Sequence, residues 1–204
     1  MWDWLQQNGP ALNVMLNAVM LLVWGAYLQL FWMSFQRANR AVIHISRAAE
    51  DGRDARLIVS NMGSEAVYIL AMQVRLTCGD RQMAASVTDK VERSPVDDED
   101  FRDRTLQGPL AGGDAVDVGG FRTVLQRAEH CLGEGVELED CSEVEVTVIV
   151  AAQQAHKLLG GYKRYRIHGS EGNLTFDSED VLTRQIRSWR HRRQLRKELT
   201  ARNV

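Results

Sequence analysis

The sequence predicts a mainly β protein, in which a single transmembrane helix precedes an immunoglobulin-like β-sandwich and a basic C-terminal helix. Three observations support this prediction. An uncharged, strongly apolar run lies near the N-terminus. Beyond it come about seven short segments of alternating or β-branched character, separated by turn residues and interrupted by one helical segment. Arginines then cluster at the C-terminus.

The apolar run predicts a membrane anchor over residues 11–35, because no charged residue lies between Ala11 and Phe35. A helix of this length extends for about 37 Å, which is enough to cross a hydrocarbon core of ~30 Å with some tilt. A cleaved signal peptide would begin with basic residues and end with small ones. Here no Lys or Arg precedes Arg37, and bulky aromatic side chains occupy the exit, which favours an anchor.

The residues that flank the anchor predict its orientation. Only Asp3 precedes the helix as a charged side chain, whereas Arg37, Arg40 and Arg47 follow it. Because basic flanks stay in the cytosol, we expect a short extracytosolic tail over 1–10 and a cytosolic domain over 36–177, at the inner (plasma) membrane. The chain has three cysteines without regular spacing, which indicates a reducing compartment rather than a disulfide framework: Cys78, Cys131 and Cys141.

Two patterns within the anchor point to helix association. Asn13 and Asn17 are four residues apart and share a face, and an interhelical amide hydrogen bond contributes ~0.5–2 kcal/mol. Ala11, Ala18 and Gly25 recur every seven residues and form a seam of small side chains. These residues predict self-association or packing against another membrane protein. The alternative is that Asn13 lies at the interface and the small residues fall there by chance.

The first half of the domain predicts four strands, at 41–47, 55–61, 65–78 and 82–89. The third alternates strictly and would bury one face: Tyr68, Leu70, Met72, Val74 and Leu76. Cys78-Gly79-Asp80 then predicts a tight turn and a hairpin. Residues 90–113 predict a long acidic loop, expected to be partly mobile, which includes Asp97–Asp100.

The second half predicts a short strand at 115–118 and a helix at 121–132 that ends at Gly133. The helix would bury one face: Phe121, Val124, Leu125, Ala128 and Leu132. In the strand at 143–152, alternate valines would face inward and Glu143, Glu145 and Thr147 outward. Residues 156–168 predict two strands turning at Gly160-Gly161, or one strand with a glycine break. A last short strand covers 174–176.

Charge is distributed very unevenly along the chain. Two arginines and one aspartate lie in 1–40, and eight basic residues and one acidic residue lie in 181–204. Therefore 15 of the 25 basic and 25 of the 27 acidic residues fall in 41–180, a net charge of −10. An acidic domain thus lies between an anchor and a strongly basic tail.

The tail predicts a helix over 178–204, with Ser178 as its N-cap. Leu182, Ile186 and Trp189 would dock its start on the domain and leave its end freer. Its basic residues are the predicted lipid-binding or partner-binding residues: Arg187, Arg190, Arg192, Arg193, Arg196 and Lys197. They would contact anionic lipid, or pair with the acidic domain or a neighbouring subunit, or form a solvated helix. Nucleic acid is disfavoured, because the acidic domain would repel phosphate.

No sequence motif predicts catalysis, a cofactor or a bound metal. His130, Cys131 and Cys141 supply three ligands where zinc requires four, and the acidic loop lacks the pattern of a calcium loop. We therefore expect a non-enzymatic membrane protein whose β domain is an interaction or assembly module and which self-associates. The alternative is a ligand or signal sensor whose oligomeric anchor helices form a polar axis. A hydrolase or transferase subunit is disfavoured, because the residues for that chemistry are missing.

Overall fold

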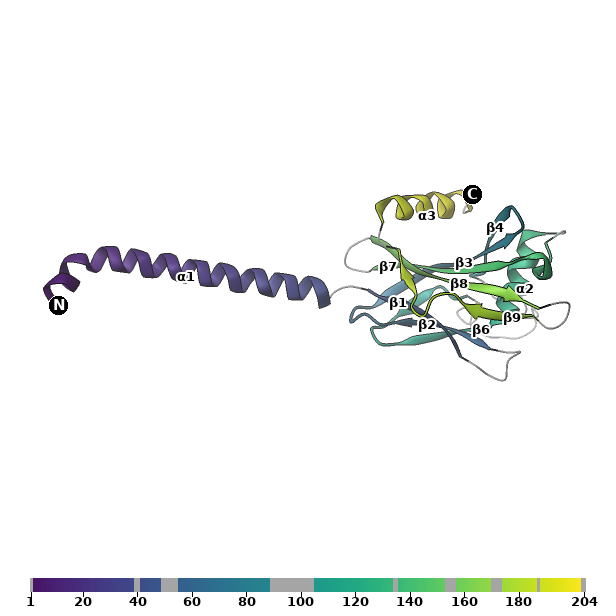
Figure 1. Ribbon diagram of the computed structural model, residues 1–204, viewed down its shortest axis with the longest axis horizontal. Helices are drawn as coiled ribbons and strands as arrows, with labels where there is room; N and C mark the ends of the chain where they lie inside the picture. Colours follow the sequence, from purple (N-terminus) through teal and green to yellow (C-terminus); the bar gives the residue numbers. More distant parts are fainter. Residues whose placement is uncertain are drawn as a thin grey trace. The chain divides into compact units, whose positions relative to one another are not determined.

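The computed structural model describes residues 2–38, 41–48, 55–88, 105–133, 136–152, 157–169, 174–186 and 188–202. The chain divides into two units, 1–40 and 41–204. The first is one helix, α1 (Trp2–Ala38), which contains the predicted span and continues beyond it on both sides (Figure 1). The segment Asn8–Phe35 has the length and composition to cross a membrane. It is compatible with an anchor, and a signal sequence at this position has the same properties.

The second unit is mainly β, as the sequence predicts. Its described strands are β1 (Ile43–Ala48), β2 (Arg56–Asn61), β3 (Val67–Cys78), β4 (Arg81–Ser86), β5 (Gly108–Leu110), β6 (Ala115–Gly120), β7 (Glu143–Ala152), β8 (Lys157–His168), β9 (Thr175–Ser178) and β10 (Arg184–Gln185). Its helical elements are α2 (Phe121–Leu132), the 3₁₀ turn η2 (Leu138–Asp140) and α3 (Trp189–Arg202).

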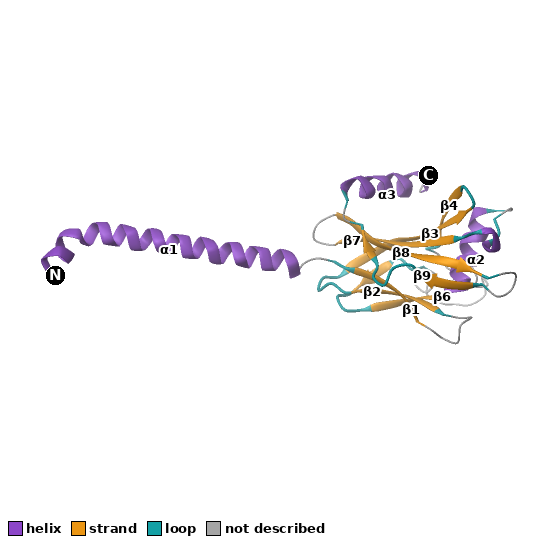
Figure 2. Ribbon diagram, viewed as in Figure 1, coloured by secondary structure: helices purple, strands orange, loops and turns teal. Residues whose placement is uncertain are grey.

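The strands form two antiparallel sheets (Figure 2). The small sheet has the order β1-β2-β6. The large sheet has the order β10-β8-β7-β3-β4, with β5 also paired to β3 and β9 to β8. The predicted hairpin is confirmed, since β3 and β4 pair from Gln73↔Ser86 to Cys78↔Arg81. The immunoglobulin-like classification stays a prediction.

One hydrophobic core is shared by both sheets. The small sheet contributes Ile43, Ile45, Leu57 and Val59, and the large sheet contributes Val74, Leu76 and the alternate valines of β7. Helix α2 has the predicted bounds and buries the predicted residues, with Leu132 partly buried: Phe121, Val124, Leu125 and Ala128. The Phe121 ring packs edge-on against Tyr165, with 4.8 Å between the ring centroids. The apolar periods read from the sequence therefore identify the core faces of α2 and β7 and part of that of β3.

A β-bulge divides β3 and corrects the alternation predicted for it. Opposite β7, Ile69 pairs with Val150 and Ala71 with Ile149, so that Leu70 has no partner. Beyond the bulge, Met72, Val74 and Leu76 face the core as predicted. Before it, the core residues are Val67 and Ile69. Tyr68 and Leu70 lie outside the core because the extra residue reverses the two faces of the strand.

Strand β7 is buried on both faces, which its alternating sequence does not predict. The alternate valines face the core as expected. On the opposite face, Ile149 is fully buried and Glu145 and Thr147 are buried too. Because α3 packs over this face, the large sheet is a middle layer rather than an outer wall (Figure 1).

Strand β8 runs without a turn through Gly160 and Gly161, so that the predicted strand pair is wrong here and the single strand is confirmed. A Cβ on Gly161 would lie 2.7 Å from Thr183 Cγ2 and 3.2 Å from Ile43 O. A Cβ on Gly160 would lie 2.5 Å from Val148 O. The glycine pair therefore allows a close approach of neighbouring segments rather than a turn.

Two further predictions are corrected by the fold. Cys78, at the end of β3, forms a disulfide with Cys141, just before β7, which leaves Cys131 exposed and free. The two segments are neighbours because β3 and β7 pair, a contact that sequence spacing does not reveal. In the predicted loop, residues 89–104 lie outside the described residues, whereas 108–110 form β5 rather than loop.

Candidate interaction surface on the C-terminal helix

Helix α3 lies against the outer face of the large sheet through one apolar stripe. Leu195 is 2% exposed and packs with Ala71, Ile149 and Ile186, and Leu199 packs beside them. The predicted docking is correct for Ile186, which is buried just before the helix, and wrong for Leu182 and Trp189, which are exposed. The middle and end of the helix are docked, whereas Trp189 at its start is 69% exposed. The predicted start at Ser178 is also wrong, because Ser178 ends β9 and the helix begins at Trp189.

Polar contacts support the docked position of α3. Arg192 Nε donates a hydrogen bond of 3.3 Å to the carbonyl of Ile186. The rings of Tyr162 and His191 lie 6.0 Å apart. Together with the apolar stripe, these contacts hold the helix in a defined rotation about its own axis.

The strand that leads into α3 is joined to β1 by side chains. The Gln185 amide donates to Ile43 O at 2.6 Å and accepts from Ile43 N at 3.2 Å. The Thr183 hydroxyl accepts from Ile45 N at 2.7 Å. These side chains satisfy the backbone groups that β1 would otherwise leave open at its edge. The first strand of the domain and the start of α3 are therefore held together.

The face of α3 opposite Leu195 is cationic. Arg190, Arg193 and Lys197 follow one another at helical spacing, and all three are exposed. With Trp189 and Gln194 they line an open hollow of about 480 Å³. The Arg193 guanidinium carbon lies 5.4 Å from the centroid of the Trp189 ring. This set of five residues is called the α3 outer face below.

The basic residues predicted from the sequence differ in their positions once α3 is docked on the sheet. Arg190, Arg193 and Lys197 lie together on the α3 outer face, and Arg196 is exposed at its flank. Arg192 turns towards the sheet, and Arg187 lies outside the described residues.

The sequence predicts that Trp189 docks on the domain, and therefore does not identify it as a surface residue. Its spacing of four from Arg193 is the signal that could have indicated the contact between them.

The predicted helix-association residues lie on α1. Its unbroken helix places Asn13 and Asn17 on one face, and Ala11 and Ala18 are exposed, as is Gly25. A Cβ on Gly25 would meet no other atom within 4 Å. These positions are therefore available for contact with another helix, and self-association stays a prediction.

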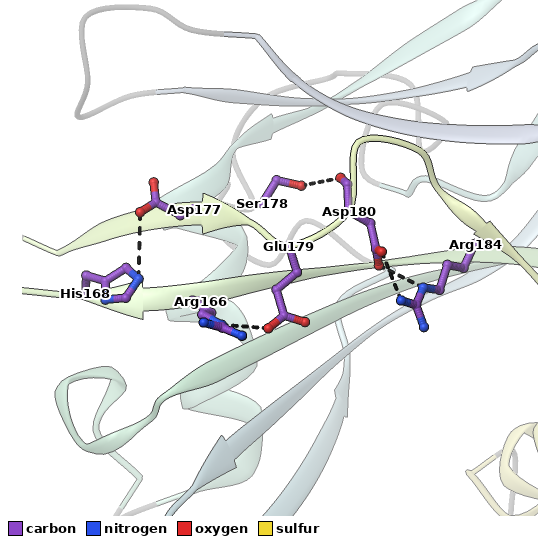
Figure 3. Close-up of a pocket in the computed structure, with 7 residues that line it drawn as sticks. All are labelled: Arg166, His168, Asp177, Ser178, Glu179, Asp180 and Arg184. Carbon is purple, nitrogen blue, oxygen red and sulfur yellow. Dashed lines mark hydrogen bonds and ion pairs between the residues drawn. The ribbon is translucent and has the colours of Figure 1, made fainter.

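A second candidate is a charged cleft of about 530 Å³ formed by β8, β9 and the segment that leads to β10 (Figure 3). Its cations are each paired with a carboxylate. Arg166 lies 2.6 Å from Glu179, and Arg184 lies 2.9 Å from Asp180. The hydrogen bond from Arg184 to Asp180 raises the pKa of this arginine. His168 lies 3.7 Å from Asp177, across the same cleft.

The two candidate sites differ in whether their charged side chains form ion pairs within the protein. In the cleft, each charged group is met by one of opposite sign. On the α3 outer face, no carboxylate in the described part of the chain forms an ion pair with Arg190, Arg193 or Lys197. The α3 outer face is therefore the better candidate for binding an external partner.

No group of three or more metal-ligating side chains occurs among the described residues. Cys141 is engaged in the disulfide, so that the set of His130, Cys131 and Cys141 is not available as a ligand group. The chain matches no protein-family model and no curated protein sequence.

Proposed function

We propose that this chain is a non-enzymatic, membrane-anchored interaction module. In this proposal α1 holds the protein at a bilayer, and the β-rich domain presents the α3 outer face to a partner. The observation that carries the proposal is the exposed Trp189 beside three cations that pair with no carboxylate among the described residues, on a helix whose opposite side is docked. A binding surface held on a rigid support loses little conformational entropy when a partner binds.

A photoreactive amino acid placed at Gln194 in the full chain tests this function. Gln194 lines the α3 outer face. We expect crosslinked products in native membranes, either protein or lipid, and their loss when Arg190, Arg193 and Lys197 are all changed to Gln. The matched control carries the same group at Gln82, an exposed residue of β4. The proposal fails if the two positions give the same products, or if the charge variant retains those of Gln194.

We further propose that the domain faces the cytosol at the inner membrane. The support is Arg37 and Arg40 after the apolar segment, with no basic residue before it. The disulfide between Cys78 and Cys141 is more usual in an oxidising compartment and weighs against this topology. Labelling of the exposed Cys131 in intact cells with a membrane-impermeant thiol reagent decides the matter. Protection of Cys131 until the cells are opened supports the cytosolic topology, and labelling of intact cells reverses it.

Self-association through α1 is the second part of the proposal. Asn13 and Asn17 share one face of the helix and form the basis of the alternative function, a sensor with a polar axis. Changing both to Leu should lower the oligomer size found by crosslinking in membranes. Oligomers of unchanged size would contradict both the amide contact and the sensor.

A further inference from the structure

We propose that the α3 outer face binds the surface of an anionic lipid bilayer. This inference rests on the proposed function and names the partner of the same face. Three properties of the described residues support lipid headgroups rather than a protein partner: the charge of the helix, the arrangement of its outer face, and the position of its start within the domain.

The first property is charge. Six basic residues and one acidic residue fall in 189–202, whereas 41–180 carries a net charge of −10. The single carboxylate, Glu198, accepts a hydrogen bond of 3.0 Å from Gln194. Helix α3 is therefore strongly cationic, whereas residues 41–180 are acidic overall. An anionic bilayer attracts such a surface by ~1 kcal/mol for each Lys or Arg close to it.

The second property is the arrangement of side chains on the α3 outer face. Protein interfaces place apolar residues at the centre and polar residues at the rim. Here the order is reversed, because Arg193 occupies the centre, with Trp189 at one end and Lys197 at the other. A cationic centre with a tryptophan at its edge suits the headgroup layer of a bilayer, where tryptophan is enriched. The hollow is also open to solvent, as contact with a flat partner requires.

The third property is where α3 begins. Gln185 bonds to Ile43 at the start of β1, and Trp189 follows Gln185 by four residues. The first strand of the domain begins at Ile43, five residues after Ala38, the last residue of α1. The start of α3 and the entry of the chain therefore lie at the same end of the second unit. A domain tethered at this end meets a membrane surface at high effective concentration, so that a weak contact suffices.

The test uses the full chain in nanodiscs, with Cys131→Ser and Ser188→Cys so that a polarity-sensitive dye labels the start of α3. One set of nanodiscs contains phosphatidylcholine alone, and the other contains phosphatidylcholine mixed with phosphatidylglycerol. We expect a blue shift of the dye emission only in the second set, and its reversal by salt. Arg193→Gln with Lys197→Gln should abolish the shift, because each lost charge weakens surface binding roughly fivefold.

The matched control, Arg81→Gln with Arg166→Gln, removes the same charge from exposed positions of β4 and β8 and should keep the blue shift. An equal shift in both lipid mixtures, or a shift that survives the loss of Arg193 and Lys197, overturns the inference. If the dye does not respond to phosphatidylglycerol but Gln194 crosslinks to a protein, the lipid inference fails and the proposed function stands. If neither signal is found, both fail.

Discussion

Asn61 shows how one buried side chain organises several turns. It is 1% exposed, and its amide nitrogen lies 2.7 Å from Glu65 O, 3.1 Å from Ala111 O and 3.2 Å from Leu110 O. Its side-chain oxygen accepts a hydrogen bond of 3.0 Å from Gly63 N. One amide thus satisfies backbone groups from two turns at the end of β2.

Asn61→Ala should therefore be strongly destabilising. It leaves one N–H donor and carbonyl acceptors buried without partners, and we expect the free energy of unfolding to fall by about 3 kcal/mol. Urea unfolding of the full chain in detergent measures this change. Asn61→Asp keeps the acceptor and loses the donors, so that it should be at least as harmful. A loss below about 1 kcal/mol for Asn61→Ala would contradict this role.

The buried Tyr165 should make the free energy of unfolding depend on pH under alkaline conditions. It is 1% exposed, and burial raises its pKa to about 12 from an ordinary value of 10.0. The unfolded chain therefore loses the phenol proton at a lower pH than the folded chain does. The contribution of Tyr165 to stability should be constant well below pH 10.0 and fall as the pH rises from there towards about 12, by roughly 3 kcal/mol in total.

Tyr165→Phe should remove this alkaline loss. The Tyr165 hydroxyl has no hydrogen-bond partner among the described residues, so that its removal should also leave stability at neutral pH unchanged or about 1 kcal/mol higher. Thermal unfolding between neutral pH and pH 11 measures both effects. Tyr68→Phe, at a half-exposed position, is the control and should keep the alkaline loss. Identical alkaline profiles for wild type and Tyr165→Phe would contradict the assignment.

At the scale of elements, the position of α3 depends on how closely β10 approaches its neighbours. Gly161 lies opposite Gln185 in the β8–β10 pair, and its missing side chain leaves room for Thr183. Thr183 and Gln185 in turn bond to β1. A change at Gly161 should therefore displace β10 and loosen the start of α3.

Gly161→Ala tests this coupling. Because the new Cβ would lie 2.7 Å from Thr183 Cγ2, we expect destabilisation by about 1–3 kcal/mol and faster hydrogen exchange in 189–202. The control is Gly108→Ala, whose Cβ would meet nothing within 4 Å. Unchanged exchange in α3 of the Gly161 variant would show that β10 does not hold the helix.

At the scale of the whole molecule, the disulfide joins two segments far apart in the chain. Cys78 and Cys141 are 63 residues apart in sequence, and the closed loop contains β4, β5, β6 and α2. Such a bond acts mainly by restricting the unfolded chain. It ties the end of β3 to the start of β7, the pair at the centre of the large sheet.

Reduction should lower the free energy of unfolding by about 4 kcal/mol, the value expected for a loop of this length from chain entropy. Urea unfolding with and without dithiothreitol measures the loss, and the double change Cys78→Ser with Cys141→Ser should reproduce it. Cys131→Ser alters an exposed, free thiol and should have no effect. A urea midpoint that is insensitive to reductant would show that the bond contributes nothing.

Local sequence patterns determined much of this protein. The apolar run predicts α1, the helical period predicts α2 with its bounds and buried face, and alternation predicts β7 and the β3–β4 hairpin. These features follow from the sequence because the period of apolar residues reports which side of an element is buried. The cationic character of the candidate site was evident for the same local reason.

Tertiary structure alone decided which residues of that candidate site lie together. The docking of Leu195 on the large sheet sends Arg192 inward and leaves Arg193 outward, although the two are adjacent in sequence. The pairing of β3 with β7 likewise sets the bulge at Leu70 and brings Cys78 to Cys141. These outcomes depend on contacts between segments far apart in the chain, whose free energies no local period records.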